Sequence, residues 1–313
     1  MNKLRNIFLL IALISLSIID LQFWDTAISN FLFWEFRFPR VVGAAITGIG
    51  LSFSGLLMQT LFRNSLAGPY LIGISPGATF GMALFIFFSS AFSFSFEISP
   101  LWGSTIGAFS ALGLQLLINR GFEHTHRLLL TGLVLGFVFS AATELMQYFG
   151  NNEQLREFTF WGMGNFERIE IEHLLSISIP VITGIVLVYF FKNSLDCYLL
   201  GDDYAQASGV NPIKIKNLLI WTGAIIAGWL TAFAGPIGFI GLVGPHIAKR
   251  LYKTESHSKI MIPAILWGGI LAVGADCIAH YSIPGILLPI NPISSLIGAP
   301  ILIISFIRKQ NRN

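Results

Sequence analysis

The side chains best suited to chemistry in this sequence are a few ionisable groups inside long apolar stretches. Glu144 and Asp276 lie within such stretches, and His246 and His280 lie nearer their ends. Placing an ionised acid inside a membrane costs free energy, so such acids often have a function. Proton relay is one such function. A relay through Glu144 or Asp276 would indicate an ion-coupled transporter. Hydrogen bonding inside a helix bundle would also satisfy both acids, and we favour that structural role.

Metal binding and covalent catalysis have little support. His124 and His126 flank Thr125, but two imidazoles on a short loop are more often solvated than metal-bound. Cys197 and Cys277 are far apart with no partner at ligand spacing, which predicts isolated thiols. No set of nucleophile, base and orienting group is present. We therefore expect no metal site and no enzyme activity.

The sequence also lacks a source of energy for transport. It has no G-x-x-x-x-G-K-[ST] phosphate loop and no soluble stretch that could hold one. We therefore expect no cofactor on this chain, and any ATP must be used by a partner subunit.

The composition of the chain indicates which solvent surrounds these ionisable groups. The 313 residues are 54% hydrophobic and only 11% charged, and the mean hydropathy is +0.72. A soluble domain has about 25% charged residues, so this chain cannot cover itself with polar side chains and must face lipid. Soluble enzymes and disordered regulators are excluded, and a formal net charge of +3 gives no indication of nucleic acid binding.

Charge-free apolar runs predict the membrane crossings, since about 20 apolar residues span the hydrocarbon core as a helix. One run ends at Ile19, and no small-x-small cleavage site follows it, so we interpret it as a retained span. The other runs cover 41–62, 64–96, 98–119, 128–143, 173–191, 217–248, 260–275 and 277–307.

The run 217–248 could form one overlong helix or two short helices separated at Gly235-Pro236. Two helices place most of the 19 Lys and Arg residues on one side, which the positive-inside tendency favours. We therefore predict an all-α membrane protein, a single domain over residues 1–313, with about ten transmembrane helices and both termini cytoplasmic.

Residues 43–48 (GAAITG) align with residues 223–228 (GAIIAG), which suggests an internal repeat. Small residues on packing helices could alone produce this likeness, but paired halves are common in transporters. Five predicted crossings separate the two segments, so they should run in opposite directions. We expect an inverted repeat with halves at roughly 37–170 and 214–307.

Several motifs, in order along the chain, resemble the FecCD family of ABC importer permeases. They are residues 37–40 (RFPR), 55–69 (GLLMQTLFRNSLAGP), 73–78 (GISPGA), 234–248 (AGPIGFIGLVGPHIA), 274–276 (GAD) and 297–300 (IGAP). The resemblance implies a permease for iron-siderophores, haem or cobalamin. It also implies ten helices per subunit and a second permease subunit, identical or not.

The resemblance implies a docking site for an extracytoplasmic substrate-binding protein at Arg37 and Arg40 on the outer face. Paired guanidiniums suit this task because they form bidentate bonds with carboxylates. His280 stands where relatives have a third arginine, and a histidine there is only partly charged near neutral pH. The alternative is that the arginines anchor a helix end among lipid headgroups.

The resemblance also implies a translocation gate and an ATPase coupling loop on the cytoplasmic side. The gate would consist of Asn64 and Leu66 together with Thr125 and His126. The coupling loop would dock into an ATP-binding cassette subunit. Its residues are Leu200, Gly201, Asp202, Ala205 and Gly209. Considered without the family, this loop would be an ordinary short helix with acids at its start.

We therefore predict the permease of an ATP-driven importer in the bacterial cytoplasmic membrane, with an iron-siderophore complex as cargo. Haem or cobalamin is the alternative cargo, and an ion-coupled secondary transporter is the rival class. Residues 284–292 (PGILLPINP) depart from the Glu-Leu-Pro-x-Gly common in relatives, so the sequence does not define the substrate.

The predicted topology can be tested with a fused reporter. A phosphatase or fluorescent reporter placed after Lys253 should report a cytoplasmic location, because the run 217–248 crosses the membrane twice and the flanking Lys and Arg residues stay inside. A reporter that is active on the outer face would contradict the ten-helix topology.

Overall fold

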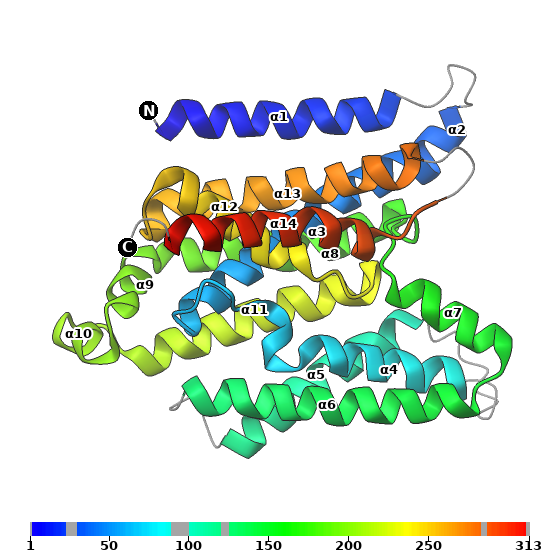
Figure 1. The fold of residues 1–313 in the computed structure, drawn as a ribbon, viewed down its shortest axis with the longest axis horizontal. Coiled ribbons are helices and arrows are strands. Elements are labelled where there is room, and N and C mark those ends of the chain that lie inside the picture. Colours follow the sequence, from blue (N-terminus) through cyan, green and yellow to red (C-terminus); the bar gives the residue numbers. More distant parts are fainter. Residues whose placement is uncertain (1, 23–29, 89–99, 120–124, 283–286, 311–313) are drawn as a thin grey trace.

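In the computed structural model, residues 2–22, 30–88, 100–119, 125–282 and 287–310 are described. All of their regular secondary structure is helical, so the predicted all-α class is confirmed (Figure 1). The long helices are α1 (Asn2–Gln22), α3 (Phe38–Leu61), α4 (Ile74–Phe88), α5 (Pro100–Asn119), α6 (Thr125–Phe149), α8 (Ile171–Phe190), α11 (Pro212–Ala234), α12 (Phe239–Tyr252), α13 (His257–Tyr281) and α14 (Ile290–Gln310). Short helices connect them: α2 (Asn30–Leu32), η1 (Phe33–Arg37), η2 (Pro69–Ile72), α7 (Asn152–Gly162), α9 (Lys192–Leu199) and α10 (Asp202–Ala207).

Seven of the described helical segments are long and apolar enough to cross a membrane. They include α1, α3 together with η1, α5, α6, α8, α11 and α13, whereas α4 and the apolar part of α14 are shorter. α12 has only 14 residues. A multi-pass membrane protein is therefore confirmed, and the count of ten crossings stays a prediction.

The run 217–248 contains two helices, as its charge pattern predicts. α11 ends at Ala234, and Gly235 then adopts a φ of 76°, which only glycine tolerates readily. α12 begins at Phe239. The break therefore depends on the Gly-Pro pair and not on any charged residue.

Other helix boundaries differ from the charge-free runs. α13 continues through Asp276 to Tyr281, and α6 continues through Glu144 to Phe149. The run 64–96 is not one helix, because α3 ends at Leu61 and α4 begins only at Ile74. Acidic residues fail as boundary markers at Asp276 and Glu144 because a helix tolerates an acidic side chain that has a polar partner or reaches a polar opening.

α3 is the central helix, and 78% of its apolar window, with η1, is buried. Ser54 Oγ donates to the carbonyl of Gly223 at 2.8 Å, and Gly50 lies against Leu230. Contacts thus move backward along α11 as α3 advances, so the two helices run antiparallel, as expected. Whether the wider halves form an inverted repeat stays a prediction.

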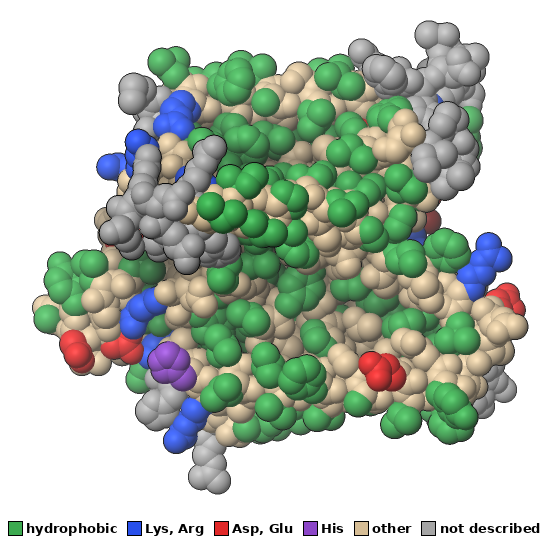
Figure 2. Space-filling view, in the orientation of Figure 1, with side chains coloured by type: hydrophobic (Ala, Val, Ile, Leu, Met, Phe, Trp, Pro, Cys, Tyr) green, Lys and Arg blue, Asp and Glu red, His purple; other side chains and the backbone are tan. Residues whose placement is uncertain are grey.

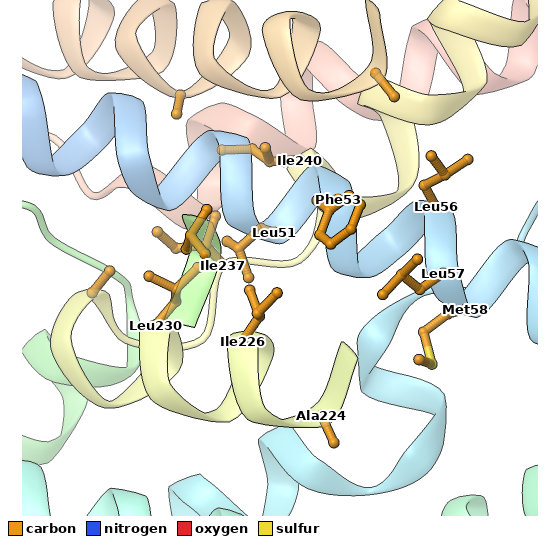
Figure 3. Close-up of a cluster of buried hydrophobic side chains, with 14 of the residues drawn as sticks. Leu51, Phe53, Leu56, Leu57, Met58, Ala224, Ile226, Leu230, Ile237 and Ile240 are labelled. Atoms are coloured by element: carbon orange, nitrogen blue, oxygen red, sulfur yellow. The ribbon is translucent and has the colours of Figure 1, made fainter. Parts of the chain in front are cut away.

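Glycines let α3 approach its neighbours at backbone distance. A Cβ built on Gly55 would overlap the carbonyl oxygen of Gly241 on α12, and one on Gly48 would overlap that of Gly268 on α13. Larger side chains fill the remaining space: Figure 3 shows Leu51 of α3 directed toward Ile226 of α11 and Ile237 of the following loop. Such close contact is the main source of attraction between helices in lipid.

The sides of the bundle are apolar and its ends are polar. Figure 2 shows hydrophobic side chains over most of the visible flank, with most charged groups toward the two ends. One end carries the start of α1, the end of α14, and α9 and α10, and the other carries α2 and α7 (Figure 1). We call them the α10 end and the α7 end. Both described termini thus lie at one end, while the membrane side of that end stays a prediction.

Replacing Gly55 with alanine should destabilise the bundle by about 2 kcal/mol or more, because helices α3 and α12 would have to separate. Gly113 on α5 is the matched control, since a Cβ there meets nothing within 4 Å. Thermal unfolding in detergent should show a lower Tm for Gly55→Ala and little change for Gly113→Ala. Equal Tm values would contradict the close packing of α3.

Candidate functional site

A groove of about 390 Å³ lies between α4, α6, α7 and the loop that follows α11, with polar side chains among its lining residues. α4 contributes Ser75 and Thr79 from successive turns. α6 contributes four polar side chains at i, i+3, i+4 and i+7, which places them on one face of the helix. They are Ser140, Thr143, Glu144 and Gln147. Hydroxyl, amide and carboxylate groups therefore meet in one groove of an otherwise apolar bundle, beside apolar groups such as Phe158 and Pro236.

Hydrogen bonds from neighbouring elements hold the groove in shape. α7 begins with a capping box between Asn151 and Gln154, and the Gln154 side chain also donates to the carbonyl of Ile86 on α4 at 3.1 Å. Asn291 of α14 lines the groove and accepts from the N–H of Gly238 at 3.2 Å. The groove thus joins elements from both ends of the sequence.

In the sequence, Glu144 is a single acid in an apolar stretch. The structure places its exposed carboxylate beside the hydroxyls of a groove that the sequence does not reveal. The signal that could have found the site is the polar stripe on α6, because four polar residues share one face of an otherwise apolar helix. Asp276, by contrast, is fully buried in an ion pair, consistent with the structural role we favoured.

The five residues predicted to couple to an ATPase form one unit at the α10 end. Ala205 is fully buried, whereas Leu200 is 68% exposed. Gly209 ends the unit with a φ of 78°, and a Cβ there would meet no other atom, so its role in the fold is conformational. Gly201, also at positive φ, precedes α10. Contact with an ATPase remains a proposal.

Asp202 holds this unit to the bundle. Its carboxylate forms ion pairs with Arg63 beyond α3 and with Lys216 on α11, the latter at 2.7 Å. Partial burial opposes ionisation, but hydrogen bonds from Lys216 and Arg63 outweigh it and lower the pKa of Asp202 below its usual value. The carboxylate is therefore charged at neutral pH and ties α10 to two long helices.

The predicted gate residues lie at the same end of the bundle as α10. Asn64 and Leu66 occupy the turn after α3, where the Asn64 side chain accepts from the N–H of Leu66 at 2.9 Å. Thr125 and His126 begin α6, and α6 starts at the α10 end (Figure 1). The structure thus brings both gate segments to one end, while gating itself stays a prediction. His124 lies outside the described residues.

A buried cluster of charges lies at the α7 end. Arg40 of α3 lies 3.0 Å from Asp20 of α1 and 3.0 Å from Asp276 of α13. His280 lies 3.4 Å from Asp276 and 3.3 Å from Glu167. The hydrogen bond with His280 is the main reason that the pKa of Glu167 is lowered. Four elements are thus joined through paired charges, and the part of Asp20 is not evident from the sequence.

This cluster changes the expectation for docking. Arg40 is only 8% exposed and His280 only 9%, so both side chains lie inside the α7 end and not on its surface. Arg37, one turn earlier, is partly exposed. Contact of these residues with a binding protein stays a prediction, and the burial of Arg40 and His280 speaks against their acting as freely exposed contacts.

Among the described residues, no group of three or more His, Cys, Asp or Glu side chains could hold a metal ion. The sequence model of the FecCD transport family matches residues 6–308. The chain belongs to the FecCD transport family. The resemblance that the ordered motifs indicated is therefore confirmed over nearly the whole chain.

Relatives of this FecCD family member transport different cargoes. The hemin transport system permease protein HmuU of Yersinia pestis is 32% identical, over 97% of this chain and 96% of HmuU. The vitamin B12 import system permease protein BtuC of Vibrio cholerae is 32% identical, over 90% of this chain and 84% of BtuC. The molybdate import system permease protein MolB of Haemophilus influenzae is 31% identical, over 86% and 78%.

A solved inward-facing ABC transporter described as of the metal-chelate type shares the fold. Its chain superposes with a TM-score of 0.88 at 28% identity, covering 98% of this chain and 99% of that one. The FecCD family chain is thus a permease of an ABC importer, a transport subunit and not an enzyme.

Replacing Arg40 with glutamine should destabilise the FecCD family chain by about 3–5 kcal/mol, because it leaves the Asp20 and Asp276 carboxylates buried without their cation. Arg168→Gln is the matched control, since Arg168 is exposed. Thermal unfolding in detergent should separate the two variants. If Arg40→Gln keeps the wild-type Tm but loses stimulation by a binding protein, Arg40 is a docking contact and not a structural clamp.

Proposed function

We propose that this permease carries an iron-siderophore complex across the bacterial cytoplasmic membrane, driven by ATP-binding cassette subunits. The observation that carries the proposal is the lining of the groove. Its side chains offer hydroxyls and amides from α4, α6 and α14, with Glu144 as the single carboxylate and no Lys, Arg or His. Groups of this kind suit a large polar ligand rich in oxygen atoms.

The same lining argues against molybdate and haem, two of the cargoes named for the relatives. Molybdate is a small oxyanion, which basic side chains or converging N–H groups would bind, and the groove offers a carboxylate instead. Haem is a flat apolar ring whose iron needs an axial ligand such as His, Met, Cys or Tyr. Tyr70 is the only such residue in the lining. A siderophore supplies all the ligands of its iron and needs none from the permease.

The charge of the groove narrows the class of chelate. Glu144 would repel an anionic complex, because opposed charges gain and like charges lose energy in a site of reduced dielectric. Three hydroxamate groups balance the charge of Fe(III), whereas three catecholates leave it strongly negative. We infer that the cargo is an uncharged chelate of the hydroxamate class. Cobalamin, which is also large and polar, remains the second candidate.

The partners follow from what the chain lacks and where its polar ends lie. With no phosphate loop in its sequence, the permease needs separate ATPase subunits, and α10 with its flanking glycines is the unit that would dock into them. A substrate-binding protein would dock at the α7 end near Arg37. A second permease subunit would face the groove and complete the pathway.

Uptake into a strain without its own siderophore importers tests this function. Cells with the permease and its partners should take up a radiolabelled ferric trihydroxamate in preference to a ferric tricatecholate, haem or cobalamin. Glu144→Lys should shift the ratio toward the anionic tricatecholate by about tenfold, which about 1.4 kcal/mol of electrostatic energy would produce. Glu172→Lys, the same charge change on the exposed start of α8, is the matched control.

Two outcomes would contradict the proposal. Uptake of haem or cobalamin without any ferric chelate would assign a different cargo. Uptake that survives loss of the ATPase but collapses with the proton gradient would favour an ion-coupled transporter.

A further inference from the structure

The first turn of α13 is capped by a residue from another helix. Asp196 of α9 accepts the backbone N–H of His257 at 2.7 Å and the hydroxyl of Ser256 at 2.7 Å. Ser256 occupies the N-cap position, yet its own side chain makes no capping bond. Helix N-termini leave N–H groups unpaired and favour negative charge. Asp196, from a distant part of the chain, accepts one of these N–H groups and brings a negative charge to the start of α13.

The imidazole of His257 extends this contact to α3. Its Nδ1 lies 2.7 Å from Asp196 Oδ1, and its Nε2 lies 2.8 Å from Thr60 Oγ1 in the last turn of α3. Thr60 and His257 are each only 1% exposed. A polar group that is buried in this way and left without a hydrogen bond destabilises the fold. Asp196, His257 and Thr60 therefore form one hydrogen-bonded chain through three helices.

A second connection joins α9 to the same end of α3. The Tyr198 hydroxyl donates to the carbonyl of Leu61 at 3.1 Å. The backbone carbonyl of Tyr198 accepts from Arg63 Nη2 at 2.7 Å, and the guanidinium lies 4.3 Å from the ring centroid. α9 thus holds the end of α3 from two sides, and Asp202 of α10 pairs with the same arginine.

The turn that follows α3 is bonded back to its last residues. The N–H of Arg63 donates to the carbonyl of Thr60 at 3.2 Å, and the N–H of Asn64 donates to that of Gln59 at 3.1 Å. Thr60 is therefore bonded directly to the turn that leads into residues 64–66, which contain two of the predicted gate residues. α10, which would receive the motion of an ATPase, is separated from Asp196 only by the end of α9 and a short turn.

We propose that Asp196, His257 and Thr60 are positioning residues that make α9, α10, the start of α13 and the end of α3 move as one body. A displacement imposed on α10 then reaches the segment 64–66 without being lost at a hinge between α9 and α3. This inference rests on the proposed function, since it assumes an ATPase that moves α10.

The isosteric variant Thr60→Val tests the chain, because it keeps the shape of Thr60 and removes the oxygen that contacts His257. In proteoliposomes with the ATPase and binding protein, uptake per ATP hydrolysed should fall about fivefold, while the rate of ATP hydrolysis stays within about twofold of wild type. Thr60→Ser should restore the ratio, because it keeps the hydroxyl. A purely structural role would lower uptake and hydrolysis together.

Thr231→Val is the matched control. Thr231 is buried in α11, where its hydroxyl donates to the carbonyl of Ala227 in its own helix. Its replacement should leave uptake per ATP unchanged. If Thr60→Val and Thr231→Val give the same ratio, the positioning role is wrong.

A distance measurement decides the question even if the cargo or energy source has been misassigned. Spin labels at Ser65→Cys and Gln206→Cys, both exposed positions, are introduced after Cys197 and Cys277 are replaced by serine. In lipid nanodiscs, the permease alone should give a narrow distance distribution that widens in Thr60→Val and not in Thr231→Val. Equal widths would overturn the proposal, whereas a failure of wild-type uptake with the expected widths would overturn only the proposed function.

Discussion

The structure depends on the close approach of α3 to the helices around it. Lipid offers no hydrophobic force to press helices together, so association requires backbone proximity and internal polar bonds. Glycines at 48 and 55 permit that proximity, and serine hydroxyls at 52 and 54 bond across it to α13 and α11. The charged clusters at the two ends of the bundle both include residues at the ends of this helix.

The same helix carries the polar chemistry at both ends of the bundle. At the α7 end, Arg40 forms ion pairs with Asp20 of α1 and Asp276 of α13. At the α10 end, Thr60 and the following Arg63 receive the contacts of α9 and α10. The central helix α3 therefore links the charge cluster at the α7 end to the α10 end, where an ATPase is proposed to act, and a tilt of α3 would move both.

The sequence predicted what depends on composition and local pattern. The lipid environment, the helical class, the break at Gly235 and the antiparallel course of α3 and α11 all followed from apolar runs, glycine and charge bias. Boundaries at Asp276 and Glu144 were wrong, because an isolated charge looks like an exposed residue until its partner or groove is known. The residues predicted to couple to an ATPase form one unit because they are contiguous in sequence, and their contact with an ATPase stays a prediction. The groove and the Asp196–His257–Thr60 chain were not predicted, since their members come from segments far apart in the sequence.

α1 illustrates a problem of biogenesis. Only 17% of its apolar window is buried, and its neighbours in the bundle are chiefly α13 and α3. Its two ends are fastened, by Arg5 to the carbonyl of Leu251 and by Asp20 to Arg40. During synthesis α1 leaves the ribosome long before α13, so for that time α1 lies in the bilayer without its main neighbour. The nearly uninterrupted apolar surface of α1 suits this exposure to lipid. Insertion of α13 then completes the charge cluster of Asp20, Arg40 and Asp276, which holds α1 in the bundle.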